Sequence, residues 1–193
     1  MTGLLENISR MQNAELIGLA KNRFLPENIQ MAIAKHPYAR AHWYLAENDG
    51  LQSSVRDYLW SDDCNRGYSL KTLLLANGRY NEDPEKFREL YRRYPSAWNR
   101  STWKMSSAFF GNYWHRNKQI PGCPGDLLNT IYDEKYDPKT RSAKPQGWYS
   151  PKYELQRLAK HPNVDLGLAI KLSQCGIEDI QKIGFNKIVE LSR

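Results

Sequence analysis

The 193-residue chain carries 28 lysines and arginines against 21 acids, a formal net charge of +7, with a mean hydropathy of −0.74. No apolar run approaches the roughly 18 residues of a membrane span, and three cysteines without a CxxC pair argue against a disulfide framework. Residues 1–16 also lack the basic and apolar regions of a signal peptide. We therefore expect a cytoplasmic protein without a membrane partner.

The first elements expected along the chain are short helices. Apolar residues recur at helical spacing over residues 3–22, which predicts a short helical entry. Pro26 suits the first turn of the next helix and Pro37 ends it. Ile29 and Ile33, four residues apart, define the buried face of that helix.

A second helix is expected after Pro37, with Ala41 and Leu45 on its buried face and an end near residues 48–50. The two helices span about 25 residues, the length of a helix pair in an α-solenoid repeat. The eleven-residue proline spacing recurs at Pro84 and Pro95 and again at Pro151 and Pro162. Val55 and Leu59 mark one degenerate copy, without the prolines, between the first of these units and the copy that begins at Pro84. When such units stack, each buries an apolar face that a single helix pair would leave exposed to water.

The chain contains a recurring pattern of Leu-Ala-x-Asn, then Pro, then Ile- or Leu-Ala-x-His-Pro. It is seen at residues 19–22, Pro26 and 33–37, and in part again at 45–48 and 158–162. The rhythm resembles the leucine-rich repeat variant, an all-helical family similar to HEAT repeats. The resemblance implies an α-solenoid that binds other macromolecules, mostly proteins and in some cases DNA in a basic concave face. Some members hold an iron–sulfur cluster on an N-terminal cysteine cluster, which this chain lacks, so no cofactor is implied.

Beyond the third copy the rhythm breaks. Residues 106–150 are aromatic, basic and rich in proline, and contain one short helix candidate that Asp126 would cap. The array then closes with a helix over residues 164–174, a stop at Gly176 and a last amphipathic helix. We expect an all-α fold and one domain, residues 1–193, made of N-terminal repeats (1–105), an insertion (106–150) and a C-terminal repeat and cap (151–193).

The net charge is concentrated in residues 86–118, where eight lysines and arginines face a single acid. Cations that neutralise phosphates, set among rings that stack on bases, are typical of a nucleic-acid surface. Arg88 and Arg92, four apart on the helix that follows Pro84, would form a cationic ridge from which acids are missing. The expected binding residues are Arg88, Arg92, Arg93, Arg100, Trp103, Lys104, Tyr113, Trp114, Arg116 and Lys118.

Other chemistry has weaker support in the sequence. His36 and His161 precede prolines at equivalent positions, which favours turn residues over metal ligands, and we expect no metal site. Cys123 lies between two Pro-Gly pairs, so it is either an exposed thiol or an ordinary loop cysteine. Asp133, in an Asp-x-Lys pattern, has the form of half a nuclease metal site, which would require a strand to carry it.

Two functions remain open at this stage. The first is a non-enzymatic protein that binds nucleic acid or a nucleoprotein through the basic, aromatic residues. The alternative is an adaptor or inhibitor, compatible with a viral or mobile-element origin, that covers an acidic surface of a larger enzyme with arginine and tryptophan anchors. A nuclease or glycosylase within residues 106–150 ranks last, because no P-loop, dinucleotide-binding or hydrolase motif occurs in the chain.

Overall fold

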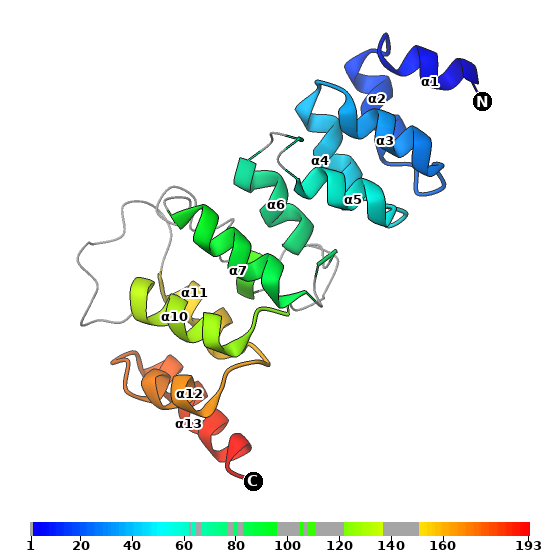
Figure 1. Ribbon diagram of the computed structural model, residues 1–193. Coiled ribbons are helices and arrows are strands. Elements are labelled where there is room, and N and C mark those ends of the chain that lie inside the picture. The colour runs from blue at the N-terminus through cyan, green and yellow to red at the C-terminus, as the bar shows by residue number, and fades with distance from the viewer. Residues whose placement is uncertain are drawn as a thin grey trace. The chain divides into compact units, whose positions relative to one another are not determined.

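The computed structural model is all-helical over the residues that it describes (Figure 1), which confirms the predicted fold class. These residues are 2–61, 63–64, 67–76, 79–80, 83–95, 105, 108–110, 122–136 and 151–193. The chain divides into two compact units, Met1–Tyr80 and Asn81–Arg193. None of the described helices has the length and apolar character that crossing a bilayer requires.

The first unit consists of paired helices in two rows. Its helices are α1 (Thr2–Ile8), α2 (Asn13–Ala20), α3 (Glu27–Lys35), α4 (Ala39–Glu47), α5 (Ser53–Trp60) and α6 (Gly67–Ala76). Helix α3 packs between α1 and α5, and α4 packs between α2 and α6, while successive helices pack across the two rows. Each helix of this unit therefore packs mainly against helices that are near it in the chain.

The buried faces in this unit are the predicted ones. Ile29 and Ile33 are at most 1% exposed on α3, and Ala41 and Leu45 are fully buried on α4. Their spacing of four places each pair on one face of its helix. Pro26 precedes α3 as its N-cap residue, where the missing N–H costs nothing. The entry predicted as one helical region is two helices, α1 and α2, because the chain turns at residues 9–12.

Side-chain amides join the loops of successive pairs. Asn48, which is buried at the C-terminus of α4, donates from Nδ2 to the carbonyl oxygens of Ala20 (2.8 Å) and Asn22 (3.0 Å). Its Oδ1 accepts from the backbone N–H of Gly50 at 2.8 Å. In the next helix pair, after α6, Arg79 Nη2 donates to the carbonyl oxygen of Asn48 at 2.6 Å. Side-chain hydrogen bonds to backbone carbonyl groups thereby join each pair to the one before it.

The second unit contains α7 (Pro84–Arg93), α10 (Gly125–Lys135), α11 (Pro151–Ala159), α12 (Leu166–Ser173) and α13 (Glu178–Leu191). Helix α10 packs on α12, α11 packs on α13, and α12 packs closely on α13. The close approach depends on Gly184, where a Cβ atom would lie 2.5 Å from the backbone nitrogen of Ser173. Gly176 has φ +80°, the left-handed conformation of a helix stop, as the sequence predicted.

Two details of this unit differ from expectation. The helix predicted near Asp126 begins at Gly125 and runs to Lys135, with Pro124 as its N-cap residue. Asp126 therefore does not cap it; the side chain lies in the first turn and binds Arg88 instead. Residues 125–135 form the helix that was expected within residues 106–150, and this helix is longer than a short candidate and packs against α12.

An ion pair fastens α13 to α11 and makes the stability of this unit depend on pH. Lys152 Nζ lies 2.6 Å from Asp179 Oδ2, and this hydrogen bond and charge lower the pKa of Asp179. A carboxylate with a lowered pKa in the folded state stabilises above its unfolded pKa, and the contribution is lost as pH falls through the folded pKa. We expect Asp179→Asn to lower the urea midpoint at pH 7, and the difference from the wild type to shrink as the pH falls below 3.8, the ordinary aspartate pKa, and to vanish only below the lower pKa of the folded state. A difference that does not shrink over this acidic range would contradict the ion-pair account.

Candidate nucleic-acid interface

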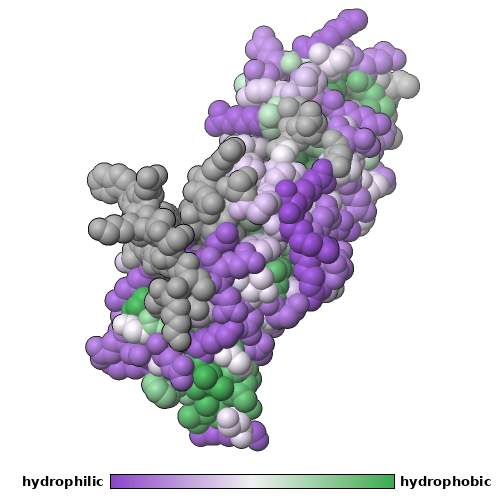
Figure 2. Space-filling view, turned by 60° about the vertical axis from the view of Figure 1, so that its left-hand side comes forward, coloured by the Kyte–Doolittle hydropathy of each residue, from purple (hydrophilic) through white to green (hydrophobic). Residues whose placement is uncertain are grey.

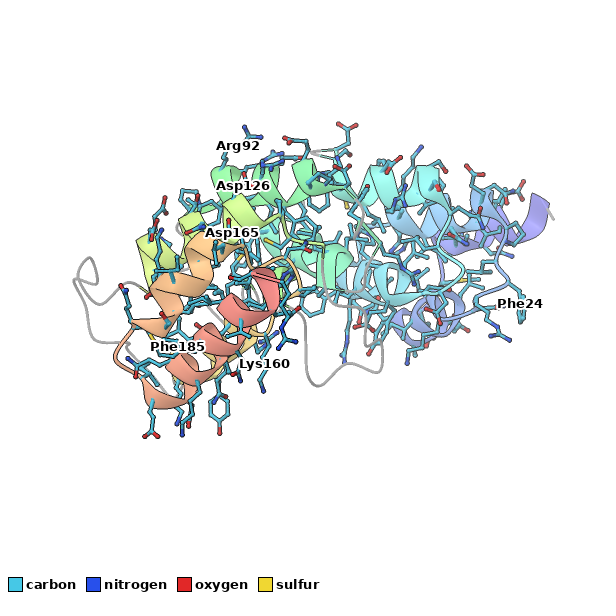
Figure 3. All side chains as sticks on the ribbon, turned by 90° about the horizontal axis from the view of Figure 1, so that it is seen from below. Phe24, Arg92, Asp126, Lys160, Asp165 and Phe185 are labelled. Atoms are coloured by element: carbon cyan, nitrogen blue, oxygen red, sulfur yellow. The ribbon has the colours of Figure 1, made fainter. Side chains whose placement is uncertain are left out.

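The cationic ridge lies on α7, where Arg88 and Arg92 share one face, as their spacing predicts. Arg92 Nε donates to the carbonyl oxygen of Arg88 at 3.3 Å, and both guanidinium groups reach Glu85. Asp83 caps the helix by accepting from the backbone N–H of Glu85 at 3.1 Å. Figure 3 shows Arg92 on the same side of the second unit as Asp126, on α10, and Asp165, the N-cap residue of α12.

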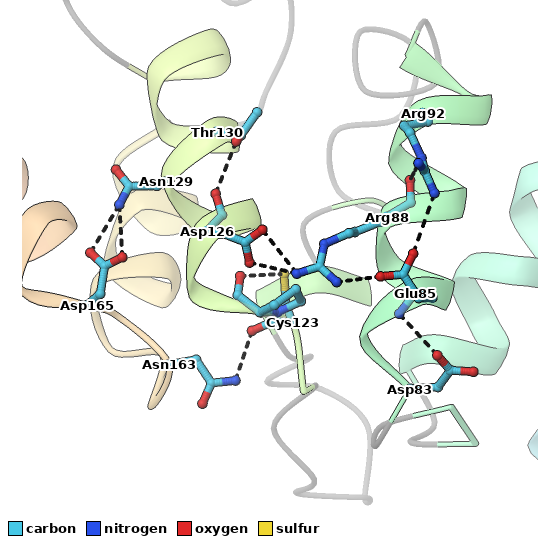
Figure 4. Close-up of polar contacts among 11 residues, drawn as sticks. Asp83, Glu85, Arg88, Arg92, Cys123, Asp126, Asn129, Thr130, Asn163 and Asp165 are labelled. Carbon is cyan, nitrogen blue, oxygen red and sulfur yellow. Dashed lines mark hydrogen bonds and ion pairs between the residues drawn. The ribbon is translucent and has the colours of Figure 1, made fainter.

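Arg88 is committed to contacts within the chain. Its Nη2 donates to both oxygens of Asp126 on α10, at 2.9 and 3.0 Å, and its Nη1 donates to Glu85 at 2.6 Å. Figure 4 shows the guanidinium held between these two carboxylates. The hydrogen bonds to Asp126 and then to Glu85 raise the pKa of Arg88. A guanidinium that is hydrogen-bonded to two carboxylates has few N–H donors left for a phosphate.

The interpretation that acids are missing from this face is wrong. Besides Arg88, Arg92 lies 3.7 Å from Glu85, and both Lys86 (3.6 Å) and Arg93 (3.8 Å) lie within ion-pair distance of Glu89. Glu85 stands one residue before the stretch in which the charges were counted, and Asp126 comes from another helix. The charge of α7 is therefore largely compensated, although the Arg92 side chain is 71% exposed.

The other expected binding residues lie outside the described part of the chain. They are Arg100, Trp103, Lys104, Tyr113, Trp114, Arg116 and Lys118. The sequence of segments 96–104, 111–121 and 137–150 contains seven lysines and arginines and one acid. The same segments contain four of the six tryptophans. The excess positive charge of the chain therefore belongs to these segments and not to α7.

Helices α10 and α12 are joined by polar contacts that account for Asp133. Lys171 Nζ lies 2.7 Å from Asp133 Oδ2 and 2.8 Å from Asn129 Oδ1, and Asn129 Nδ2 donates to Asp165 at 3.0 Å. Asp133 is on a helix and is neutralised by a lysine, whereas the nuclease hypothesis required a strand-borne carboxylate free to bind a metal. Asp133 therefore does not have the geometry that this hypothesis required of it.

Two histidines have the predicted turn role. His36 Nδ1 accepts from the backbone N–H of Tyr38 at 3.2 Å, and His161 Nδ1 accepts from that of Asn163 at 3.1 Å. The two bonds repeat the same local geometry at the two His-Pro sequences. Among the described residues, no three or more histidine, cysteine, aspartate or glutamate side chains come together as a group that could hold a metal.

Cys123 is fully buried, so the exposed-thiol reading is wrong. Burial raises the pKa of its thiol well above the ordinary value, and the charge of Asp126 adds to this. A buried protonated thiol is a poor nucleophile. The backbone around Cys123 has a structural role, because its carbonyl oxygen accepts from Asn163 Nδ2 at 2.9 Å.

Sequence reasoning missed a set of exposed apolar side chains on the last two helices. Leu166 and Ile170 on α12, and Phe185 and Val189 on α13, are each between 42% and 58% exposed. Figure 2 shows hydrophobic residues gathered where these helices form the lower end of the view. Each pair is spaced by four, a signal readable in sequence, but the same spacing predicts a buried face equally well.

No protein-family model, curated protein or solved structure matches the chain.

Proposed function

We propose that this protein binds nucleic acid, and that the binding surface is supplied by the basic, aromatic segments 96–104, 111–121 and 137–150. The observation that carries the proposal is a contrast in charge. On α7 each cation has an acid of α7 or α10 within 3.8 Å, whereas the three segments carry seven cations and one acid in their sequence. Lysines and arginines interleaved with tryptophan and tyrosine, with one acid among them in the sequence, suit a phosphate backbone and stacked bases.

The helical units would then act as the scaffold of this surface. We also propose that the helix pairs are degenerate repeats of the leucine-rich variant type. The two-row packing of α1 to α6 and the repeated His-Pro turns support this proposal. In this proposal Arg88 and Arg93 mainly stabilise the helices, and Arg92 contacts the nucleic acid at the edge of the binding surface.

Removal of four cations tests the proposal. The variant Arg100→Ala, Lys104→Ala, Arg116→Ala, Lys118→Ala is expected to lose most of its affinity for a fluorescent single-stranded or duplex oligonucleotide. The dependence of log K on log salt concentration should also flatten, by about 0.9 for each duplex phosphate that the variant no longer neutralises. Fluorescence anisotropy from 50 to 200 mM salt measures both quantities.

A matched variant controls for net charge alone. It removes four exposed cations elsewhere, at Arg10, Arg40, Lys160 and Lys182. We expect this variant to keep most of the wild-type affinity and its salt dependence. Equal loss in the two variants would contradict the assignment to these segments, and absence of binding by the wild type at 50 mM salt would contradict nucleic-acid binding itself.

A protein partner is the second candidate, and the exposed apolar pairs on α12 and α13 favour it. Apolar side chains set among charged ones are typical of protein–protein interfaces. In the adaptor or inhibitor reading, arginine and tryptophan anchors would cover an acidic surface of a larger enzyme. Co-purification from cell extract with and without nuclease separates the two functions, because a protein that stays bound after nuclease treatment supports the second.

A further inference from the structure

A cysteine and a histidine that the proposed function does not use lie together in the first unit. Cys64, in the connection between α5 and α6, places its Sγ 3.8 Å from Nδ1 of His42 on α4. The two residues are 22 positions apart in sequence. His42 is 1% exposed and Cys64 is 7% exposed, so the pair is screened from bulk water.

The hydrogen bond on the other side of the ring determines which nitrogen carries the proton. His42 Nε2 lies 2.7 Å from the carbonyl oxygen of His36, and a carbonyl can only accept. In the neutral ring Nε2 is therefore the donor, and Nδ1 presents its lone pair to Cys64. A nucleophile next to a base, with that base oriented by a third group, is the arrangement that activates a thiol.

The other two cysteines lack this arrangement. Cys175 is 7% exposed, the same as Cys64, but its Sγ contacts the carbonyl oxygen of Ile177 at 4.0 Å. Cys123 is fully buried and contacts the carbonyl oxygen of Pro124 at 3.9 Å. A carbonyl oxygen can accept a thiol hydrogen bond but does not take up the proton. The chain therefore contains its own comparison, in which Cys64 and Cys175 have equal exposure and differ in the adjacent base.

We propose that Cys64 is a site of covalent modification by small electrophiles, with His42 as the base that generates its thiolate. The Cys64 proton moves to Nδ1 of His42, which leaves a thiolate beside an imidazolium and no change in net charge. With a peroxide, the thiolate attacks one peroxide oxygen, the O–O bond breaks, and hydroxide or alkoxide leaves and takes a proton. The sulfur is oxidised by two electrons to a sulfenic acid, and the peroxide is reduced.

Site-resolved alkylation of the native full chain tests the proposal. The protein is treated with dilute iodoacetamide at pH 7.5, quenched over time and digested, and the modified fraction of each cysteine is measured by mass spectrometry. The alkylation rate of each cysteine in the native protein is divided by its rate in urea, where all three thiols are accessible. We expect Cys64 to react roughly tenfold faster than Cys175, the ratio expected when only one thiol has a base beside it, and Cys123 to react slowest.

The variant His42→Gln keeps a side-chain donor for the carbonyl of His36 but removes the base. Its Cys64 rate should fall to that of Cys175, and circular dichroism checks that the variant is folded. In a second arm, hydrogen peroxide followed by dimedone should label Cys64 and spare Cys175. The proposal is overturned if native Cys64 reacts no faster than Cys175, a comparison that needs no variant, or if folded His42→Gln leaves the Cys64 rate unchanged.

Discussion

Replacement of Gly50 by alanine is expected to destabilise the first unit by about 3 kcal/mol, a large effect for one added methyl group. A Cβ atom at this position would lie 1.9 Å from the carbonyl oxygen of Arg23 and 2.8 Å from its carbonyl carbon. Both are backbone atoms of another loop, so no side-chain rotation can relieve the overlap. The loops must separate for the variant to fold.

Separation is costly because hydrogen bonds hold Gly50 in place. Its N–H donates to Asn48 Oδ1 and its carbonyl oxygen accepts from Gln30 Nε2, both at 2.8 Å. Gln30 is itself fully buried, so a broken bond would leave one N–H of its amide without an acceptor, while the bond from Nε2 to the carbonyl oxygen of Leu25 at 2.9 Å would remain. Urea unfolding followed by circular dichroism measures the loss, and hydrogen exchange of peptides from residues 1–80 assigns it to the first unit.

Gly18 provides the matched control, with the same substitution in the same unit. It lies within α2, and a Cβ atom there meets no other atom within 4 Å. Alanine is favoured over glycine inside a helix, so Gly18→Ala should stabilise by about 0.5 to 1 kcal/mol. Effects of the same sign for Gly18→Ala and Gly50→Ala would refute the packing argument.

Substitution of Asn48 by alanine is expected to cost about 2 to 4 kcal/mol in the same unit, because three hydrogen bonds around a buried amide are removed together. The carbonyl oxygen of Ala20 loses the Asn48 donor, that of Asn22 keeps only the longer bond from the N–H of Leu25 at 3.4 Å, and the N–H of Gly50 loses its acceptor. Thermal and urea unfolding of the variant measure this cost.

Asn22 is the counterpart of Asn48 in the preceding pair and serves as its control. Its Oδ1 accepts from the backbone N–H of Phe24 at 3.0 Å, the same local bond that Asn48 makes to Gly50. However, Asn22 is exposed. Its alanine variant should therefore lose about 1 kcal/mol or less. If Asn22→Ala and Asn48→Ala cost the same, the stabilisation comes from the local turn and not from the link between pairs.

The helices and their buried faces could be predicted because they depend on local spacing. Ile29 and Ile33 lie one turn apart, and a proline at either end fixes where α3 can begin and end. The left-handed stop at Gly176 is predictable for the same reason, since few residues other than glycine adopt that conformation.

The candidate site could be predicted less well, because it depends on partners that are distant in sequence. Arg88 is 38 residues from Asp126, and His42 is 22 residues from Cys64. No periodicity indicates which carboxylate will reach a given guanidinium. A count of charges along a stretch of chain therefore overestimates the free charge on α7, where an acid just outside the stretch and another from α10 complete the ion pairs.

The side-chain links between loops also bear on how the first unit unfolds. Asn48 binds the carbonyl oxygen of Asn22, and Arg79 binds that of Asn48, so each link runs from one helix pair to the one before it. Opening the middle pair removes a donor from one neighbour and an acceptor from the other. Local openings of the linked pairs should therefore be coupled in free energy, and we expect the pairs to exchange their amide hydrogens as a cooperative block instead of opening one by one.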